Sequence, residues 1–150
     1  MHIAIDASVL VAIINPHDLW HTQAKALIDG LDRAEFTPVN FDCAVTEAVS
    51  VLVRRLHEKG YGDEVPQMLE QFRAFIPPNL IIWILPDVPR LYADALELIR
   101  NSNGELNFND ALIALACRER GIPAIASFDA DFDRVDWLKR IAEPKDLFSD

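Results

Sequence analysis

The sequence predicts an α/β fold with a mostly parallel central sheet that is covered by helices on both sides. Short apolar segments alternate along the chain with longer segments whose apolar residues recur at helical spacing. The short segments are apolar at nearly every position, as expected for strands that are buried on both faces. The chain has 150 residues, 51% of them hydrophobic, so we expect one domain over residues 1–150 with a substantial core.

The first elements follow from apolar runs and from the residues that end them. A buried strand is expected over residues 2–6, followed by a helix with Ser8 as its N-cap that ends at Asn15 and the proline after it. Apolar residues at helical spacing predict a second helix over residues 20–31. Residues 35–39 are predicted to form the next short strand.

The middle of the chain predicts two helices and one strand. The apolar residues within 45–56 form one stripe of a helix that stops at Gly60, and those within 65–76 form another, closed by two prolines. The apolar run over residues 80–85 is bounded by Pro86 and is short enough for a buried strand.

The last third of the chain repeats the alternation. A helix is expected over residues 92–99, ended by Asn103 and the glycine after it, and another over residues 107–120. Residues 123–128 are predicted to form a strand, and residues 137–141 a last short one. In a parallel sheet, ligands bind beyond the carboxyl ends of the strands, so polar residues at those ends are candidate site residues.

The formal charge is −10, from 24 acidic and 14 basic side chains, which argues against binding nucleic acid by bulk attraction. A polyanionic substrate therefore requires a metal ion or a local basic patch. Apolar runs are far shorter than a membrane helix needs, and Asp6 interrupts any signal-peptide core, so we expect no membrane association and a cytoplasmic location. Cys43 and Cys117 are expected to be buried free thiols, although a single disulfide remains an alternative.

Four acidic residues stand where predicted strands pass into helices or loops, or early in a helix: Asp6, Glu47, Asp110 and Asp129. Carboxylates next to an apolar core lose hydration, which is costly. Several of them together also repel one another, and a divalent cation is the usual remedy. The pattern therefore indicates a metal site.

Three of these acids also have a purely structural interpretation. Asp6 would be a helix cap, but Ser8 is better placed for that role. Asp110 would be a first-turn acid in a helix capped by Asn107, but it shares the apolar face of its helix, which a dipole effect does not explain. For Glu47, spacing alone leaves a first-turn acid and a site residue equally open.

The segment from Asp129 to Asp133 has an acid at every second position, as at the start of a calcium-binding EF-hand loop. That loop requires glycine at its sixth position and glutamate at its twelfth, which here are Arg134 and Arg140, so the EF-hand is excluded. Asp129 is the best metal candidate of the three acids, Asp131 is a second, and Asp133 is expected to be solvated.

Other enzyme classes lack their residues. His17 and His21 have the spacing of a zinc protease, but Asp18 stands where the catalytic glutamate belongs and no third ligand is evident. There is no glycine-rich phosphate loop among only five glycines. Ser8 has no credible histidine and acid partners for nucleophilic catalysis.

The strand before Asp6-Ala-Ser8, the pair Thr46-Glu47, the segment Asn109-Asp110-Ala-Leu-Ile-Ala and the segment Ser127-Phe-Asp129-Ala-Asp131-Phe resemble the PIN domain family. More narrowly, they resemble the VapC-type toxins of bacterial and archaeal toxin–antitoxin pairs. The order, the spacing and the total length match, over nearly the whole chain. The combination is more specific for the fold than for the toxin role.

The resemblance implies a Rossmann-like α/β/α sandwich and a Mg²⁺- or Mn²⁺-dependent ribonuclease. By family position, the metal-binding and catalytic quartet would be Asp6, Glu47, Asp110 and Asp129. Ser8 would support it, and Asp131 would match a less constant acid nearby. Phe128 departs from the family, where many relatives have asparagine. A small antitoxin protein and a homodimer are the partners that the resemblance implies.

Basic residues near the site are the candidates for contacts with an RNA substrate, and Arg134, Lys139 and Arg140 follow Asp129 most closely. Their alternative interpretation is ordinary solvated charge, as for the basic residues near the ends of helices. Two other functions remain open at this stage. One is a housekeeping RNA-processing nuclease with the same fold, and the other is a non-catalytic protein-interaction module.

Overall fold

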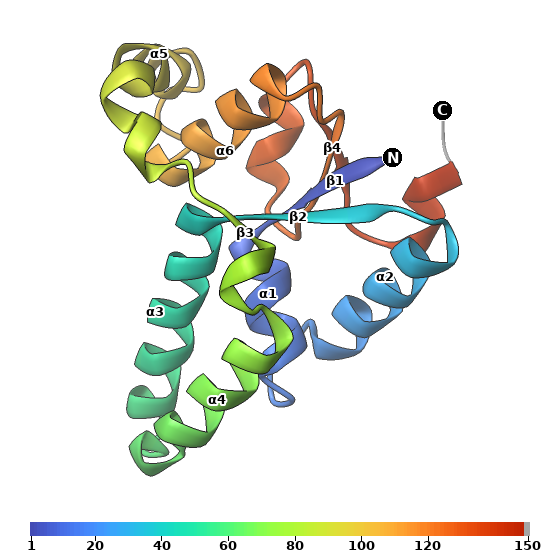
Figure 1. Cartoon of the computed structure of the whole chain (residues 1–150), viewed down its shortest axis with the longest axis vertical. Coiled ribbons are helices and arrows are strands. Elements are labelled where there is room, and N and C mark those ends of the chain that lie inside the picture. Colours follow the sequence, from blue (N-terminus) through green and yellow to red (C-terminus); the bar gives the residue numbers. More distant parts are fainter. Residues whose placement is uncertain (149–150) are drawn as a thin grey trace.

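The computed structural model describes residues 1–148, in which five parallel strands form one sheet in the order β3-β2-β1-β4-β5 (Figure 1). The sheet confirms the predicted fold class. β1 lies at its centre, between β2 and β4. The strands are β1 (His2–Ile5), β2 (Thr37–Phe41), β3 (Ile81–Ile82), β4 (Ala124–Ala126) and β5 (Lys139–Ile141).

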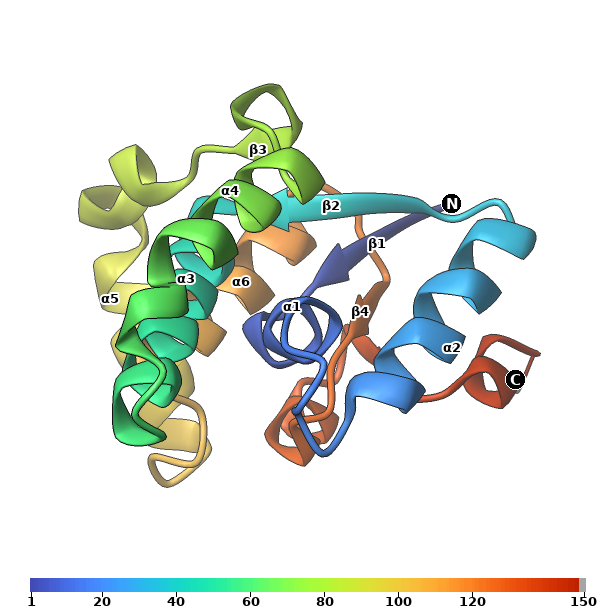
Figure 2. The ribbon, with the colours of Figure 1, turned by 90° about the horizontal axis from the view of Figure 1, so that it is seen from below.

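Helices cover both faces of the sheet (Figures 1 and 2). Within β1, Ile3 and Ile5 join the core formed with α1 to α4, while Ala4 joins the core formed with α5 and α6. Side chains alternate between the two faces of a strand, so one apolar strand serves two cores. The helices are α1 (Ala7–Ile14), α2 (His21–Arg33), α3 (Asp42–Glu58), α4 (Val65–Phe75), α5 (Val88–Asn101) and α6 (Phe108–Glu119).

The predicted strand over residues 80–85 is wrong in its extent. Only Ile81–Ile82 pair with β2, and Trp83 and Leu85 are exposed. The buried carboxylate of Asp42, at the start of α3, accepts the backbone N–H of Leu85 at 2.9 Å and so ends the sheet pairing there. The chain then enters a short 3₁₀ helix, η3 (Leu85–Asp87).

The predicted boundaries of β2 are also shifted, by two residues. Glu35 has a φ of 56°, in the left-handed region, and the N–H of Phe36 bonds back to the carbonyl of Leu31. These residues form the turn that ends α2, so the strand begins only at Thr37. The apolar pattern did not distinguish the helix exit from the strand.

The two thiols, Cys43 and Cys117, are free and buried, which confirms the sequence prediction. Burial raises the pKa of each to about 12, so both are unreactive neutral thiols at neutral pH. Within residues 1–148, no helix has the length and apolar character needed to cross a bilayer.

Candidate active site at the carboxyl ends of the strands

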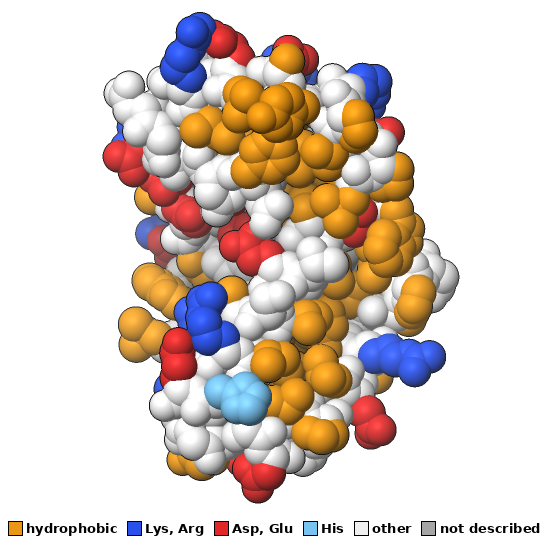
Figure 3. Space-filling model, turned by 90° about the vertical axis from the view of Figure 1, so that its left-hand side faces the viewer, with side chains coloured by type: hydrophobic (Ala, Val, Ile, Leu, Met, Phe, Trp, Pro, Cys, Tyr) orange, Lys and Arg blue, Asp and Glu red, His pale blue; other side chains and the backbone are white. Residues whose placement is uncertain are grey.

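The four acids predicted from the sequence line one cavity of about 300 Å³. Asp6 follows β1, Glu47 lies in the second turn of α3, Asp110 lies in the first turn of α6, and Asp129 follows β4 by three residues. Adjacent parallel strands end at the same edge, which brings together residues that are more than 100 positions apart. Figure 3 shows acidic side chains in the middle of one face, between the part that carries α5 and α6 and the part that carries α3.

Asp6 is itself the N-cap of α1, which corrects the prediction that Ser8 holds this position. Its side chain accepts the backbone N–H of Ser8 at 3.3 Å, and the Ser8 hydroxyl donates to the same oxygen, Oδ2, at 2.6 Å. Asp6 is only 5% exposed, and burial raises the pKa of its carboxyl, opposed by these hydrogen bonds. Capping is therefore no alternative to a site role, because one carboxylate can serve both.

A second serine, Ser127, completes the support of Asp6. Its hydroxyl donates to Asp6 Oδ2 at 2.8 Å and accepts the N–H of Asp129 at 3.0 Å, while the Ser8 hydroxyl accepts the N–H of Phe128 at 3.1 Å. Two hydroxyls thus tie the loop after β4 to the carboxylate after β1. Ser127 is fully buried. Sequence reasoning did not single it out as a site residue, although a hydroxyl residue directly after an apolar strand and two positions before Asp129 was a usable signal.

Asp110 points inward at the start of α6 and forms a capping box with Asn107. The Asp110 carboxylate accepts the N–H of Asn107 at 3.0 Å, and the Asn107 side chain accepts the N–H of Asp110 at 2.9 Å. Burial, with added repulsion from Asp6, Asp129 and Glu47, raises the pKa of Asp110 to about 7. The cap fixes the side chain beside the other carboxylates at an electrostatic cost.

Glu47 is half-buried and faces the same cavity from α3. The side-chain amide of Asn109 donates to Glu47 Oε2 at 3.3 Å and orients it across the gap between α3 and α6. Burial raises the pKa of Glu47, the Asn109 hydrogen bond opposes that shift, and the charges of Asp6 and Asp129 add to it. The tertiary contact decides what spacing alone left open, namely whether Glu47 lies with the other acids.

Asp129 and Asp131 differ in their surroundings. Asp129 lines the cavity and caps the 3₁₀ helix η4 (Ala130–Arg134) by accepting the N–H of Asp131 at 2.9 Å. Asp131 does not line the cavity, and its carboxylate lies 3.7 Å from the guanidinium of Arg134. Its role beside the quartet stays a prediction.

The basic residues of the tail also lie outside the cavity lining. Arg140 forms a two-pronged ion pair with Asp133 at 2.8 and 2.9 Å, and Arg134 pairs with Asp131 and Glu105. Lys139 is exposed on β5. RNA contact by these three residues stays a prediction. The basic residue that does line the cavity, among those that the structure describes, is Arg55 of α3.

The donors of this site suit a hard divalent cation. Across residues 1–148, no three His, Cys, Asp or Glu side chains stand close enough together to form a ready-made ligand set. Mg²⁺ and Mn²⁺ take oxygen ligands, and Mg²⁺ keeps several of its waters, so few direct protein contacts suffice. The four carboxylates that line the cavity repel one another, and a cation bound between them would relieve that repulsion. The residues present therefore fit a divalent metal ion.

Comparison with known proteins agrees with the resemblance seen in the sequence. The PIN domain family model matches residues 3–138. Among solved structures, VapC20 of Mycobacterium tuberculosis, a toxin that cleaves the sarcin–ricin loop, shares the fold with a TM-score of 0.67. The likeness covers 90% of this chain and 95% of that chain at 22% sequence identity. No curated protein matches the chain.

Proposed function

Because the chain belongs to the PIN domain family, we propose that it is an endoribonuclease that uses Mg²⁺ or Mn²⁺, and that it is the toxin of a VapC-type toxin–antitoxin pair. The observation that carries the proposal is the convergence of Asp6, Glu47, Asp110 and Asp129 on one cavity from four different elements. A solved relative by fold, VapC20, is a toxin that cleaves RNA at the sarcin–ricin loop, which supports the same class of substrate.

The quartet would hold the cation, directly or through water. A bound divalent ion supplies charge neutralisation for the phosphodiester and a water of lowered pKa. The protein residues supply the rest. The serine pair holds Asp6, Asn107 holds Asp110, and Asn109 holds Glu47, so three carboxylates are oriented before substrate arrives.

Two carboxylates are candidates for orienting the attacking water, Glu47 and Asp129. Glu47 is less buried than Asp6 or Asp110, and burial raises its pKa, which makes its carboxylate a better proton acceptor than a solvated glutamate. Asp129 uses one carboxylate oxygen, Oδ1, to cap η4. Both carboxylates, Glu47 and Asp129, are therefore candidates to be tested for the water-orienting role.

The proposal includes two protein partners and a cytoplasmic location. A small antitoxin would hold the enzyme inactive. A homodimer would cover the hydrophobic side chains that lie exposed on α4, on the segment from β3 to η3, and on α5, and that run along the face seen in Figure 3. They include Phe75, Trp83, Leu85, Tyr92 and Leu96.

Cleavage of RNA by the purified protein tests the function. With Mn²⁺ present, the wild-type chain should cut structured RNA, and EDTA should stop it. Asp6→Asn and Asp110→Asn should each lower the rate by more than about 100-fold, because each removes a carboxylate from the metal site. Asp94→Asn, which changes an exposed acid of α5, is the control and should cut like the wild type.

The outcomes separate the three functions that the sequence left open. Full cleavage by both site variants would contradict the assigned site. No cleavage and no Mn²⁺ binding by calorimetry would favour a non-catalytic interaction module. Growth arrest on expression without a partner, relieved by Asp110→Asn, is expected of a toxin and not of a housekeeping nuclease.

A further inference from the structure

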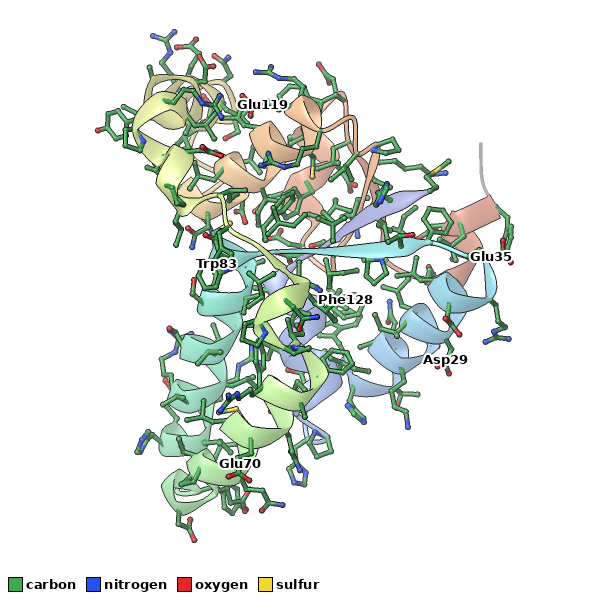
Figure 4. All side chains as sticks on the ribbon, in the orientation of Figure 1. Asp29, Glu35, Glu70, Trp83, Glu119 and Phe128 are labelled. Atoms are coloured by element: carbon green, nitrogen blue, oxygen red, sulfur yellow. The ribbon has the colours of Figure 1, made fainter. Side chains whose placement is uncertain are left out.

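An aromatic pair forms one wall of the cavity beside the carboxylates. The ring of Trp20 stacks on that of Phe128, with centroids 5.3 Å apart and planes inclined by 18°. Both residues line the same cavity as the acidic quartet. Phe128, labelled in Figure 4, is partly buried against the core on the α1 side of the sheet and lies below the sheet near the middle of the molecule.

One face of the Trp20 ring is covered by Phe128, yet the residue is 44% exposed. Because Trp20 also lines the cavity, part of its exposed surface is open to a group bound there. Contact of a large aromatic ring with water costs free energy, and a second flat group that covers the ring removes that cost. Nucleobases are flat, and every base has a π face that stacks on such a ring.

Asp18 holds this wall in place. Its side chain is only 6% exposed, and it accepts the backbone N–H of Trp20 at 2.8 Å and the guanidinium of Arg55 at 2.5 Å. His21 anchors the following turn through a 2.7 Å hydrogen bond between its Nδ1 and the carbonyl oxygen of Ala12. Trp20 is thus presented by a fixed loop, and the same buried carboxylate orients both the ring and Arg55.

Because the cavity is acidic, an uncharged contact to a base would add affinity for RNA that charge alone does not give. Five carboxylates and one guanidinium, that of Arg55, are among the described residues that line it. A phosphate that approaches this set is repelled until a cation is bound, so charge alone gives RNA little affinity. Stacking of a base does not depend on charge and can hold a nucleotide at the cavity mouth.

We propose that Trp20, backed by Phe128, is the platform for one unstacked base of the RNA substrate, and that Arg55 contacts a phosphate of the same nucleotide. This inference rests on the proposed ribonuclease function and adds a positioning residue to it. It favours a substrate that is single-stranded at the cut, as in a loop or bulge, because an unpaired base leaves its stack at a lower free-energy cost than a paired one.

A cycle of protein and RNA changes tests the platform. The substrate is a short RNA that the wild-type chain cuts at one bond, together with versions that carry a single abasic site at each nucleotide flanking that bond. On intact RNA, Trp20→Ala should raise KM about tenfold, the size of one lost base stack, with kcat within about twofold. Trp20→Phe keeps a ring and should retain most of the affinity.

The abasic RNAs distinguish a base contact from a structural role. At one position, removal of the base should cost the wild type about tenfold in KM, and Trp20→Ala should then add no further loss. Leu19→Ala changes a 91% exposed neighbour in the same loop and serves as the control for local disturbance, with KM expected to be unchanged. A loss in Trp20→Ala that is the same on every abasic RNA would overturn the proposal.

Salt dependence separates the roles of Trp20 and Arg55. The effect of Arg55→Gln on KM should shrink as salt is raised, because a phosphate contact is electrostatic, whereas the effect of Trp20→Ala should persist. If the wild type cuts no RNA at all, the proposed function fails. If it cuts RNA and Trp20→Ala has a KM within twofold of the wild type, only the platform fails.

Discussion

Asp110 caps a helix and at the same time places a buried carboxylate in the candidate site. It caps α6 through the N–H of Asn107, and it is held among three other carboxylates at a position only 5% exposed. Folding therefore leaves this acid with a pKa of about 7, far above its ordinary value of 3.8. The carboxylate caps the helix, but its ionisation lowers the free energy of unfolding of the metal-free protein.

The pH dependence of stability should report that cost. Between pH 4 and 7 the folded state of the metal-free chain binds more protons at Asp110 than the unfolded state, so the free energy of unfolding falls as pH rises through this window. In urea denaturation with EDTA, this group should lower the free energy of unfolding by on the order of 2 kcal/mol between pH 5 and pH 8, at up to about 1.4 kcal/mol per pH unit below its folded pKa.

Asp110→Asn keeps an acceptor for the Asn107 N–H and cannot ionise. It should be more stable than the wild type at pH 8 and similar to it at pH 4. The exposed control Asp94→Asn should keep the wild-type slope. Equal slopes in the wild type and Asp110→Asn would show that Asp110 is already ionised in the folded protein at pH 5.

At the scale of elements, the sheet edge depends on a side chain that the sequence analysis did not notice. Asp42 is 1% exposed and accepts two backbone N–H groups at 2.9 Å, from Cys43 and from Leu85. It joins the start of α3 to the segment that follows β3. An apolar run such as residues 80–85 looks like a buried strand until such a tertiary bond is known.

Removal of that bond should loosen the edge without harming the site. Asp42→Ala leaves two buried N–H groups without their acceptor and should lower the free energy of unfolding by about 2 kcal/mol, measured by urea denaturation. Asp42→Asn retains one acceptor oxygen and should lose less. Asp42 does not line the cavity, so RNA cleavage at low temperature should be unchanged, and a loss of cleavage in the folded Asp42→Ala protein would contradict this separation.

At the scale of the whole molecule, the sequence predicted the features that follow from the pattern of apolar residues and from parallel strands, namely the fold class and the edge of the sheet where acids gather. The sequence predicted that Asp6, Asp110 and Asp129 lie together, as they do in the cavity, because a charge at the end of an apolar segment is costly and parallel strands bring such ends together. The N-cap of α1 was misassigned because Asp6 caps the helix and faces the cavity at once.

The aromatic wall could not be predicted in the same way. Trp20 and Phe128 are 108 positions apart, and Asp18 and Arg55 come from a loop and from the last turn of α3. Nothing in their local spacing distinguishes them from ordinary surface and core residues. Only the packing of α1, α2 and α3 against the loop after β4 brings them to one cavity.

The most direct test is a crystal structure of the protein with Mn²⁺, in which the metal is located by its anomalous scattering. The account predicts one or two Mn²⁺ ions in the cavity, with carboxylate oxygens of Asp6 and Asp110 among their direct or water-mediated ligands. Mn²⁺ bound elsewhere, with Asp6 and Asp110 still joined only to their serine and asparagine partners, would contradict it.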